Sequence, residues 1–387
     1  MLNITSKKEV TFIFMTKNMN SGSYFLHGLL DQHPEILVMP IAFDYPLIKN
    51  WETTNYWSLD FLNLFLDKYF KPMLTEKSIT VGETDQSHSL SIVKSLKKIF
   101  SEKSKKLIYN KMKNLVNKHE AKKFQLLQFL ESFSKIYKEL FLPNQRSYVA
   151  ILIPLHFMLT NLKKPDKGYM YYQGSFVKLI KKNKRCKLVH ITRDPIANYG
   201  SGVYSLNHGG RAALIALLNI YREYFNCIKP FDKYFGKVQF MILSNEMIHL
   251  NPERELKKLS RFIGVNFIQK TMFQTSIIGK IWLGNSAFGK IDTFDVSLRS
   301  SKNWFKIIST HERNVIEWLL KDMIMTYGFP HTNDGKNIIK RVTSLLYLFT
   351  FMESKKNIKQ KGFFKSIKIQ IKADLLFIFM SFRNAKL

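Results

Sequence analysis

Residues 10–36 read VTFIFMTKNMNSGSYFLHGLLDQHPEI, and this stretch decides the fold class. Its first six residues, 10–15, are apolar, aromatic or β-branched and predict a short buried strand. A polar loop follows at residues 16–21, and a helical pattern runs over residues 22–31 and stops shortly before a proline. A strand, a polar turn and a helix in this order are typical of the opening of a nucleotide-binding α/β unit.

Further along the chain, three apolar runs predict additional buried strands, at residues 148–153, 187–191 and 238–243. A long helical pattern covers residues 211–229, and a lysine-rich helical segment covers residues 89–140. Strands that alternate with helices indicate an α/β fold with a central, mostly parallel sheet flanked by helices on both faces.

We find no internal repeat and no low-complexity linker, so we expect one main domain over residues 1–336, with a helical insertion at about 89–140. Over residues 337–387, apolar positions recur at helical spacing with lysines beside them, which predicts a basic amphipathic helical extension. Such a helix either packs on the core or lies on an anionic membrane surface, and both interpretations stay open.

The charge balance is strongly basic, with 60 Lys and Arg against 29 Asp and Glu and a net charge of +31. This excess favours a polyanionic partner, but a diffuse solvated basic surface explains it equally well. The two cysteines, Cys186 and Cys227, exclude a disulfide framework and a cysteine-based metal site, and they fit a reducing compartment. No apolar run reaches the roughly 20 residues of a membrane span, so we expect a cytoplasmic protein, at most peripheral at a membrane.

The loop after the first predicted strand has the features of an anion site. Gly22 lets the backbone approach a ligand closely, and the free N–H groups at the start of the next helix favour an anion. Ser21 and Ser23 add hydroxyl donors, and Lys17 adds a positive charge. The pattern is not a Walker A loop, and helix capping alone also explains a Ser-Gly-Ser turn.

A second candidate phosphate site follows the strand predicted at residues 187–191. Arg193 stands at the strand end, and Ser201 lies eight residues later, in the helix that Pro195 is suited to begin. An arginine at a strand end and a serine in the next helix can clamp one phosphate from two sides. The alternative is a structural arginine paired with Asp194.

Both sites resemble the phosphate loops of the sulfotransferase family that uses 3′-phosphoadenosine 5′-phosphosulfate (PAPS). In that family a strand leads into Pro-Lys/Arg-Ser-Gly-Thr-Thr and a helix that ends in Leu-Leu-Asp-x-His-Pro, which residues 21–23 and 29–34 match. The family's Arg-Asp/Asn-Pro motif, with a serine eight residues beyond the arginine, is matched from residue 193 to 201. A third similarity, over residues 243–265, is interpreted as a structural segment that closes the sheet.

The resemblance implies a P-loop-like sulfotransferase fold and an enzyme that moves a sulfuryl group from PAPS to an acceptor hydroxyl, with no metal. It departs from the family at Asn20, where a basic residue normally precedes Ser-Gly, and Lys17 is the nearest replacement for contact with the sulfuryl group. The residues that the resemblance implies for donor binding are Lys17, Asn20, Ser21, Gly22, Ser23, Tyr24, Arg193 and Ser201, with Gly284, Ser286 and Lys290 from a looser match.

The general base is sought at Glu83, because Gly82-Glu83-Thr84 resembles the Gly-Glu-Lys-Thr-Pro stretch of carbohydrate-type sulfotransferases. His88 and His156 are the reserve candidates. The acceptor is a molecule with a free hydroxyl, whether a glycan, a lipid or a small molecule, and the match at Glu83 favours a carbohydrate or a glycolipid. Residues 89–140 carry 13 lysines against 4 glutamates, which suits an anionic or membrane-borne acceptor or simply a solvated helical face.

Three other interpretations remain. A kinase-like nucleotide-binding protein is disfavoured because the Gly-Lys-Ser/Thr motif is absent. A basic protein that binds nucleic acid or membranes fits the charge but does not explain two phosphate loops in family order, so we expect no nucleic-acid partner. A non-catalytic relative that binds the donor fits the missing basic residue at Asn20.

Overall fold

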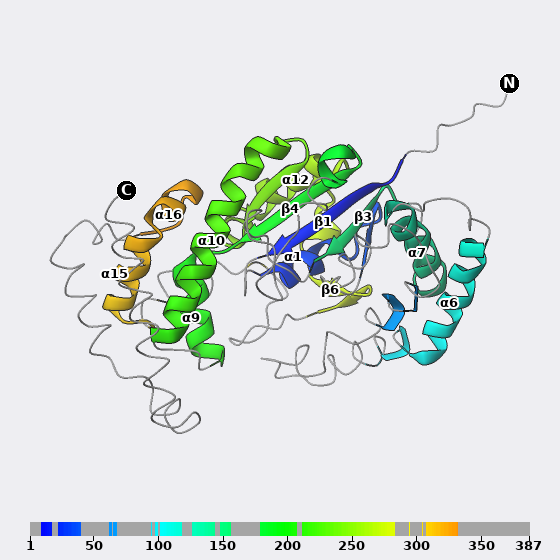
Figure 1. Cartoon of the computed structure of the whole chain (residues 1–387), viewed down its shortest axis with the longest axis horizontal. Helices are drawn as coiled ribbons and strands as arrows, with labels where there is room; N and C mark the ends of the chain where they lie inside the picture. Colours follow the sequence, from blue (N-terminus) through cyan, green and yellow to red (C-terminus); the bar gives the residue numbers. More distant parts are fainter. Residues whose placement is uncertain are drawn as a thin grey trace.

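A five-stranded parallel sheet with helices on both faces forms the centre of the molecule (Figure 1). The structure is a computed structural model, and it describes residues 9–17, 22–39, 62–63, 65–67, 94, 97–99, 101–117, 126–143, 148–155, 179–206, 211–282, 294, 304 and 307–331. In this part of the chain, no helix has both the length and the apolar composition needed to cross a membrane.

The strand order is β2-β3-β1-β4-β5, and every neighbouring pair is parallel. The predicted α/β fold is therefore confirmed, and each of the four predicted strands corresponds to an observed one. The strands are β1 (Thr11–Lys17), β2 (Ile36–Val38), β3 (Ala150–Pro154), β4 (Cys186–Thr192) and β5 (Phe240–Ser244). Strand β2 was not predicted, because three residues are too few to show a periodic pattern.

Helices cover both faces of the sheet. The described helices are α1 (Ser23–Leu30), α6 (Glu102–Asn117), α7 (Leu126–Phe141), α9 (Pro195–Leu206), α10 (Arg211–Phe235), α11 (Asn245–Leu250), α12 (Pro252–Ile263), α13 (Gln269–Met272), α15 (Thr310–Leu319) and α16 (Lys321–Tyr327). A small antiparallel hairpin joins β6 (Ser276–Ile277) to β7 (Lys280–Ile281).

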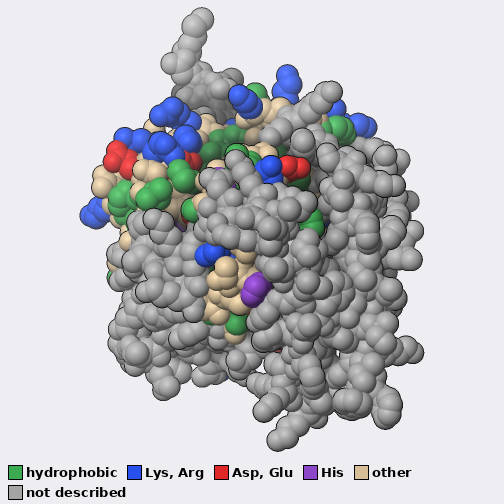
Figure 2. All heavy atoms as spheres, turned by 90° about the vertical axis from the view of Figure 1, so that its left-hand side faces the viewer, with side chains coloured by type: hydrophobic (Ala, Val, Ile, Leu, Met, Phe, Trp, Pro, Cys, Tyr) green, Lys and Arg blue, Asp and Glu red, His purple; other side chains and the backbone are tan. Residues whose placement is uncertain are grey.

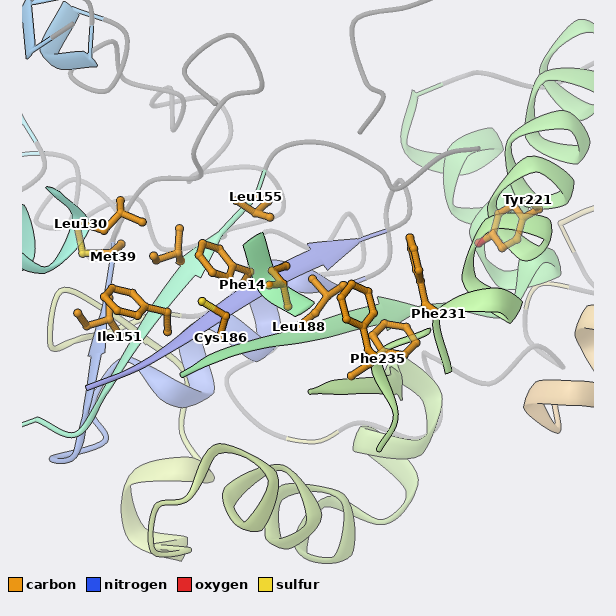
Figure 3. Close-up of a cluster of buried hydrophobic side chains, with 14 of the residues drawn as sticks. Phe14, Met39, Leu130, Ile151, Leu155, Cys186, Leu188, Tyr221, Phe231 and Phe235 are labelled. Atoms are coloured by element: carbon orange, nitrogen blue, oxygen red, sulfur yellow. The ribbon is translucent and has the colours of Figure 1, made fainter. Parts of the chain in front are cut away.

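The alternation of side chains along β1 divides the core into two layers. Phe12 and Phe14 belong to a cluster with residues of α7, α9, α10, α15 and α16, whereas Ile13 and Met15 belong to a cluster with residues of α1, α11 and α12. In the first layer, Leu130 of α7 lies near one end of the drawn cluster and α10 contributes at the other (Figure 3). Both faces of β1 are thus buried, as expected for a central parallel strand.

The lysine-rich segment 89–140 contains α6 and α7. Helix α7 buries Phe129, Phe133 and Tyr137 in the first core layer, so it forms part of the cover of the sheet. Helix α6 packs beside α7, where Lys111 and Glu139 form an ion pair at 2.6 Å. The proposed extension 337–387 lies outside the described residues, and the domain boundary at residue 336 stays a prediction.

Strands β1 and β4 are neighbours whose connections leave in opposite directions. The chain runs from β1 through α1 to the β2 edge, and from β4 through α9 and α10 to the β5 edge. In parallel α/β sheets, ligands bind outside the carboxyl ends of the strands at such a switch point. Lys17 is in register with Ile191, so the segments after β1 and β4 begin side by side.

The Leu-Leu-Asp-x-His-Pro motif anchors the end of α1 to later parts of the chain. The Asp31 carboxylate accepts hydrogen bonds from Ser276 Oγ at 2.8 Å and from the Gly279 N–H at 2.7 Å, and thereby holds the β6–β7 hairpin. His33 Nε2 donates to the Asn266 carbonyl at 2.8 Å. These contacts give the motif a structural role that fixes the orientation of α1.

Candidate functional site

Three segments of the chain meet at the carboxyl end of the sheet. Strand register places Lys17 of β1 beside Ile191 of β4, and Thr192 of β4 beside Ser244 of β5. The residues that follow these strands therefore emerge at the same edge. This edge is where the two predicted phosphate sites and the segment starting at residue 243 come together.

Gly22 forms the start of α1 and packs against Asn245. Its φ of 78° lies in the left-handed region that favours glycine, and no side chain caps this helix end. A Cβ at this position would lie 2.1 Å from Asn245 Oδ1. Both the backbone conformation and the close packing therefore require glycine here.

Lys17 stands at the last position of β1, beside the first turn of α1. Its ammonium group lies 4.7 Å from the centroid of the Tyr24 ring, within the range of a cation–π interaction. Burial lowers the pKa of Lys17 to about 8. Together with Ser23, Lys17 and Tyr24 line a small cavity between β1, α1 and the end of β3.

His27 lines the same cavity one turn further along α1. Its Nε2 lies 2.9 Å from the Met39 carbonyl oxygen. Because a carbonyl only accepts, Nε2 carries the proton, and the lone pair of the neutral ring is on Nδ1. Burial lowers the pKa of His27, so the neutral form is favoured. Sequence reasoning did not select this residue.

Arg193 forms a buried ion pair with Glu246. The Arg193 side chain is 7% exposed, and its Nε lies 3.9 Å from Glu246 Oε1. Glu246 also accepts hydrogen bonds from the Asp194 N–H at 3.2 Å and from Ser244 Oγ at 2.9 Å. Burial raises the pKa of Glu246, and the Arg193 charge opposes that shift. The pair connects the end of β4 to the end of β5.

Hydrogen bonds fix the backbone around Arg193. Asp194 Oδ1 accepts from the Ile196 N–H at 2.8 Å and so caps the start of α9. The Tyr221 hydroxyl donates to the Arg193 carbonyl at 3.1 Å and lies 2.5 Å from the amide nitrogen of Asn198. The carboxylate of Asp194 thus supports the helix start, while Glu246 pairs with the guanidinium.

Trp304 and α9 form one wall beside Arg193. The guanidinium carbon of Arg193 lies 5.7 Å from the Trp304 ring centroid. A Cβ at Gly200 would lie 2.6 Å from Trp304 Cε3, so the indole packs directly on the helix backbone. Ser201, the next residue of α9, is partly exposed.

The structure brings Lys17, Gly22, Ser23, Tyr24 and Arg193 to the carboxyl edge of the sheet or to the helix start beside it, with Ser201 on α9. The remaining predicted site residues and the reserve bases lie outside the described residues, namely Asn20, Ser21, Glu83, His88, His156, Gly284, Ser286 and Lys290. Sequence reasoning missed the contacts of Asn245, Glu246 and Trp304. The first two follow a predicted strand directly, and that position was the available signal.

The face in Figure 2 shows no single uniform basic area among the described residues. On the face in Figure 2, Lys and Arg side chains lie among acidic and hydrophobic ones. On α12, Lys257 pairs with Glu253, and Arg254 and Lys258 both pair with Glu255. The polyanionic partner suggested by the net charge stays a prediction.

A comparison with protein families identifies the chain. The model of the family described as "Sulfotransferase domain" matches residues 12–277, which is well over half of the sequence. The chain belongs to the sulfotransferase domain family. The match begins in β1 and ends with β6, so it contains both candidate phosphate segments of this sulfotransferase. Sulfuryl transfer is the general chemistry of the family.

Two solved sulfotransferase domains are similar to this chain. One is the sulfotransferase domain of the Synechococcus PCC 7002 olefin synthase, with 13% identity, a TM-score of 0.47, and coverage of 84% of this chain and 98% of that one. The other is the sulfotransferase domain from the curacin biosynthetic pathway, with 12% identity, a TM-score of 0.42, and coverage of 84% and 99%. No curated protein matches the chain.

Proposed function

We propose that this sulfotransferase transfers a sulfuryl group from PAPS to a hydroxyl group of its acceptor. The observation that carries the proposal is the register of β1 and β4, in which Lys17 lies beside Ile191. It places the two segments that resemble the donor's phosphate loops next to each other at the switch point of the sheet. A molecule with phosphates at both ends of a nucleoside fits such a pair of loops.

The start of α1 is the proposed site for the 5′ end of the donor. The predicted contacts there are Asn20, Ser21, Gly22, Ser23 and Tyr24, of which Ser23 and Tyr24 begin α1. Gly22 adopts the left-handed φ of 78° from which α1 begins, and the N–H groups of this helix start favour an anion. Lys17 supplies a positive charge from the end of β1.

The start of α9 is the proposed site for the 3′-phosphate. Arg193 is held there by Glu246 and stays charged when buried. Ser201 adds a hydroxyl from the same helix. Gly284, Ser286 and Lys290 remain predicted donor contacts from the segment after β7.

The chemistry needs an aligned acceptor, a base for its proton, and stabilisation of charge on the oxygen that leaves the sulfur. PAPS supplies the sulfuryl group. We assign Lys17 to the charge that develops near the helix start, because its ammonium lies 4.7 Å from the centroid of the Tyr24 ring in the first turn of α1. We assign the base to Glu83, with His88 and His156 as alternatives.

The acceptor class that the Glu83 stretch favours is a carbohydrate or a glycolipid, and other lipids and small molecules with a hydroxyl are the alternatives. We propose a cytoplasmic location, in which residues 337–387 either pack on the core or make peripheral contact with an anionic membrane. A non-catalytic donor-binding protein is the second candidate, because Asn20 replaces the family's basic residue.

The test is transfer of label from [35S]PAPS to four acceptor pools: oligosaccharides, glycolipids in vesicles, other lipids in vesicles, and small alcohols and phenols. We expect labelled product from one pool, and its loss in Glu83→Gln with retained binding of adenosine 3′,5′-bisphosphate. The matched control is Glu253→Gln, an exposed carboxylate on α12. If the protein binds the donor but neither transfers the label nor hydrolyses PAPS in any pool, the result would support the non-catalytic alternative and contradict the proposed activity.

A further inference from the structure

Asn245 is the first residue after β5, and its side chain packs on the start of α1. The residue is only 1% exposed. The three atoms nearest to a Cβ built on Gly22 all belong to its carboxamide, with Oδ1 at 2.1 Å, Cγ at 2.7 Å and Nδ2 at 3.3 Å. The carboxamide therefore fills the space that a side chain at position 22 would occupy.

The Nδ2 group of Asn245 is buried and has no hydrogen-bond partner among the described residues. A buried N–H without a partner is costly and rare in folded proteins. Its neighbours in sequence are both satisfied, because Ser244 Oγ donates to Glu246 Oε2 and Glu246 also accepts from the Asp194 backbone. The side chains of these two neighbours thus have partners, whereas Asn245 Nδ2 has none among the described residues.

The other side of this contact is a helix start with its own unpaired donors. The first N–H groups of a helix have no partner within the helix, and at Gly22 no side chain caps them. They lie at the positive end of the helix dipole, with Lys17 at the adjacent strand end. The unpaired Nδ2 of Asn245, which lies 3.3 Å from the Cβ position of Gly22, therefore stands beside this helix start as a further donor for an anion.

We propose that Asn245 binds the 5′-phosphate of the donor through Nδ2, as a contact additional to the loop between β1 and α1. This inference rests on the proposed function, because it assigns a residue to the same donor site. It gives the start of α11, directly after β5, a part in binding and explains why a neutral amide stands at this position. A carboxylate of the same shape would repel the phosphate instead of donating to it.

The experiment compares two ligands by calorimetry, adenosine 3′,5′-bisphosphate and adenosine 3′-monophosphate, which lacks the 5′-phosphate. For Asn245→Ala we expect the bisphosphate to bind about tenfold to one-hundredfold more weakly, as for a lost hydrogen bond to a charged group. The 3′-monophosphate should bind the variant and the wild type alike. Asn245→Asp should lose at least as much bisphosphate affinity and remains informative if the alanine variant does not fold.

The matched control is Asn251→Ala at the start of α12, where the asparagine makes no side-chain capping bond. Equal losses for both ligands, or no loss for either, would overturn the assignment of Asn245 to the 5′-phosphate. Failure of the folded wild type to bind the bisphosphate would instead overturn the proposed function, and the inference with it. Thermal unfolding of each variant separates loss of a contact from loss of the fold.

Discussion

The guanidinium group of Arg193 and the carboxylate of Glu246 lie against each other, with Nε and Oε1 3.9 Å apart. Arg193 follows β4 and Glu246 follows β5, so the pair ties together two strand ends that are far apart in the sequence. Both groups are mostly removed from water, which makes each dependent on the other for charge compensation. Arg193, which we propose binds the 3′-phosphate, is therefore held in position by Glu246. Glu246 belongs to the segment 243–265, the third similarity to the family.

Removal of the Glu246 carboxylate should destabilise the protein. Glu246→Ala leaves the buried Arg193 charge without this partner and removes acceptors from Ser244 and the Asp194 backbone. We expect the free energy of unfolding to fall by about 3 kcal/mol, as for other broken buried ion pairs. Urea unfolding measures the change. Glu253, which forms an exposed ion pair with Lys257, offers a control. Glu253→Ala should change the free energy of unfolding by less than about 1 kcal/mol.

A side chain at position 22 should disrupt the donor site more than backbone strain alone. In Gly22→Ala the new Cβ would lie 2.1 Å from Asn245 Oδ1, and the alanine would also have to adopt a φ of 78°. Gly236 has a similar φ of 69° and nothing within 4 Å of a built Cβ, so Gly236→Ala isolates the strain. We expect about 1 kcal/mol of destabilisation for Gly236→Ala. Gly22→Ala should be clearly more destabilised and should lose most of its affinity for adenosine 3′,5′-bisphosphate. Equal effects of the two substitutions would contradict the role of the packing contact.

The charge of Lys17 should make donor binding depend on pH. Burial lowers the pKa of Lys17 to about 8, so the free protein loses this positive charge as the pH rises through that value. We expect the affinity for adenosine 3′,5′-bisphosphate to fall above pH 8 in the wild type. Lys17→Met should bind more weakly at pH 7 and lack this part of the pH dependence. Lys138→Met is the control, because Lys138 also stacks on a ring, that of Tyr148, away from this site.

Burial of His190 should make stability depend on pH. Its Nδ1 is hydrogen-bonded to Thr16 Oγ1 at 2.8 Å, and burial lowers its pKa from 6.5 to about 3. Below pH 6.5 the unfolded chain binds a proton there that the folded protein does not. His190 should therefore lower the free energy of unfolding by about 1.4 kcal/mol for each pH unit below this value.

Urea unfolding between pH 7 and pH 5 measures this dependence. His190→Gln should show a shallower decline than the wild type, and the surface control His331→Gln should follow the wild type. Parallel curves for the wild type and His190→Gln would show that His190 does not titrate on unfolding.

The strands were readable from the sequence because buried parallel strands are continuous apolar runs, as at residues 11–17 and 186–192. The motif residues Gly22 and Arg193 were also accessible, since each follows such a run. The contacts of Asn245 and Glu246 were not, because they depend on β5 lying beside β4 and on β4 lying beside β1. Strand order is a property of the whole fold and leaves no local pattern in the chain.

The central claim is that the segments after β1 and β4 hold the two phosphates of one donor. The most direct measurement is calorimetric titration of the wild type and Arg193→Ala with adenosine 3′,5′-bisphosphate and with adenosine 5′-monophosphate, with Arg254→Ala on α12 as the control. We predict that the wild type and the control prefer the bisphosphate by about one-hundredfold, as expected for charge-assisted bonds to the 3′-phosphate. Arg193→Ala should bind both ligands equally weakly. A folded wild type that binds neither ligand, or an Arg193→Ala variant that keeps the preference, would contradict the account.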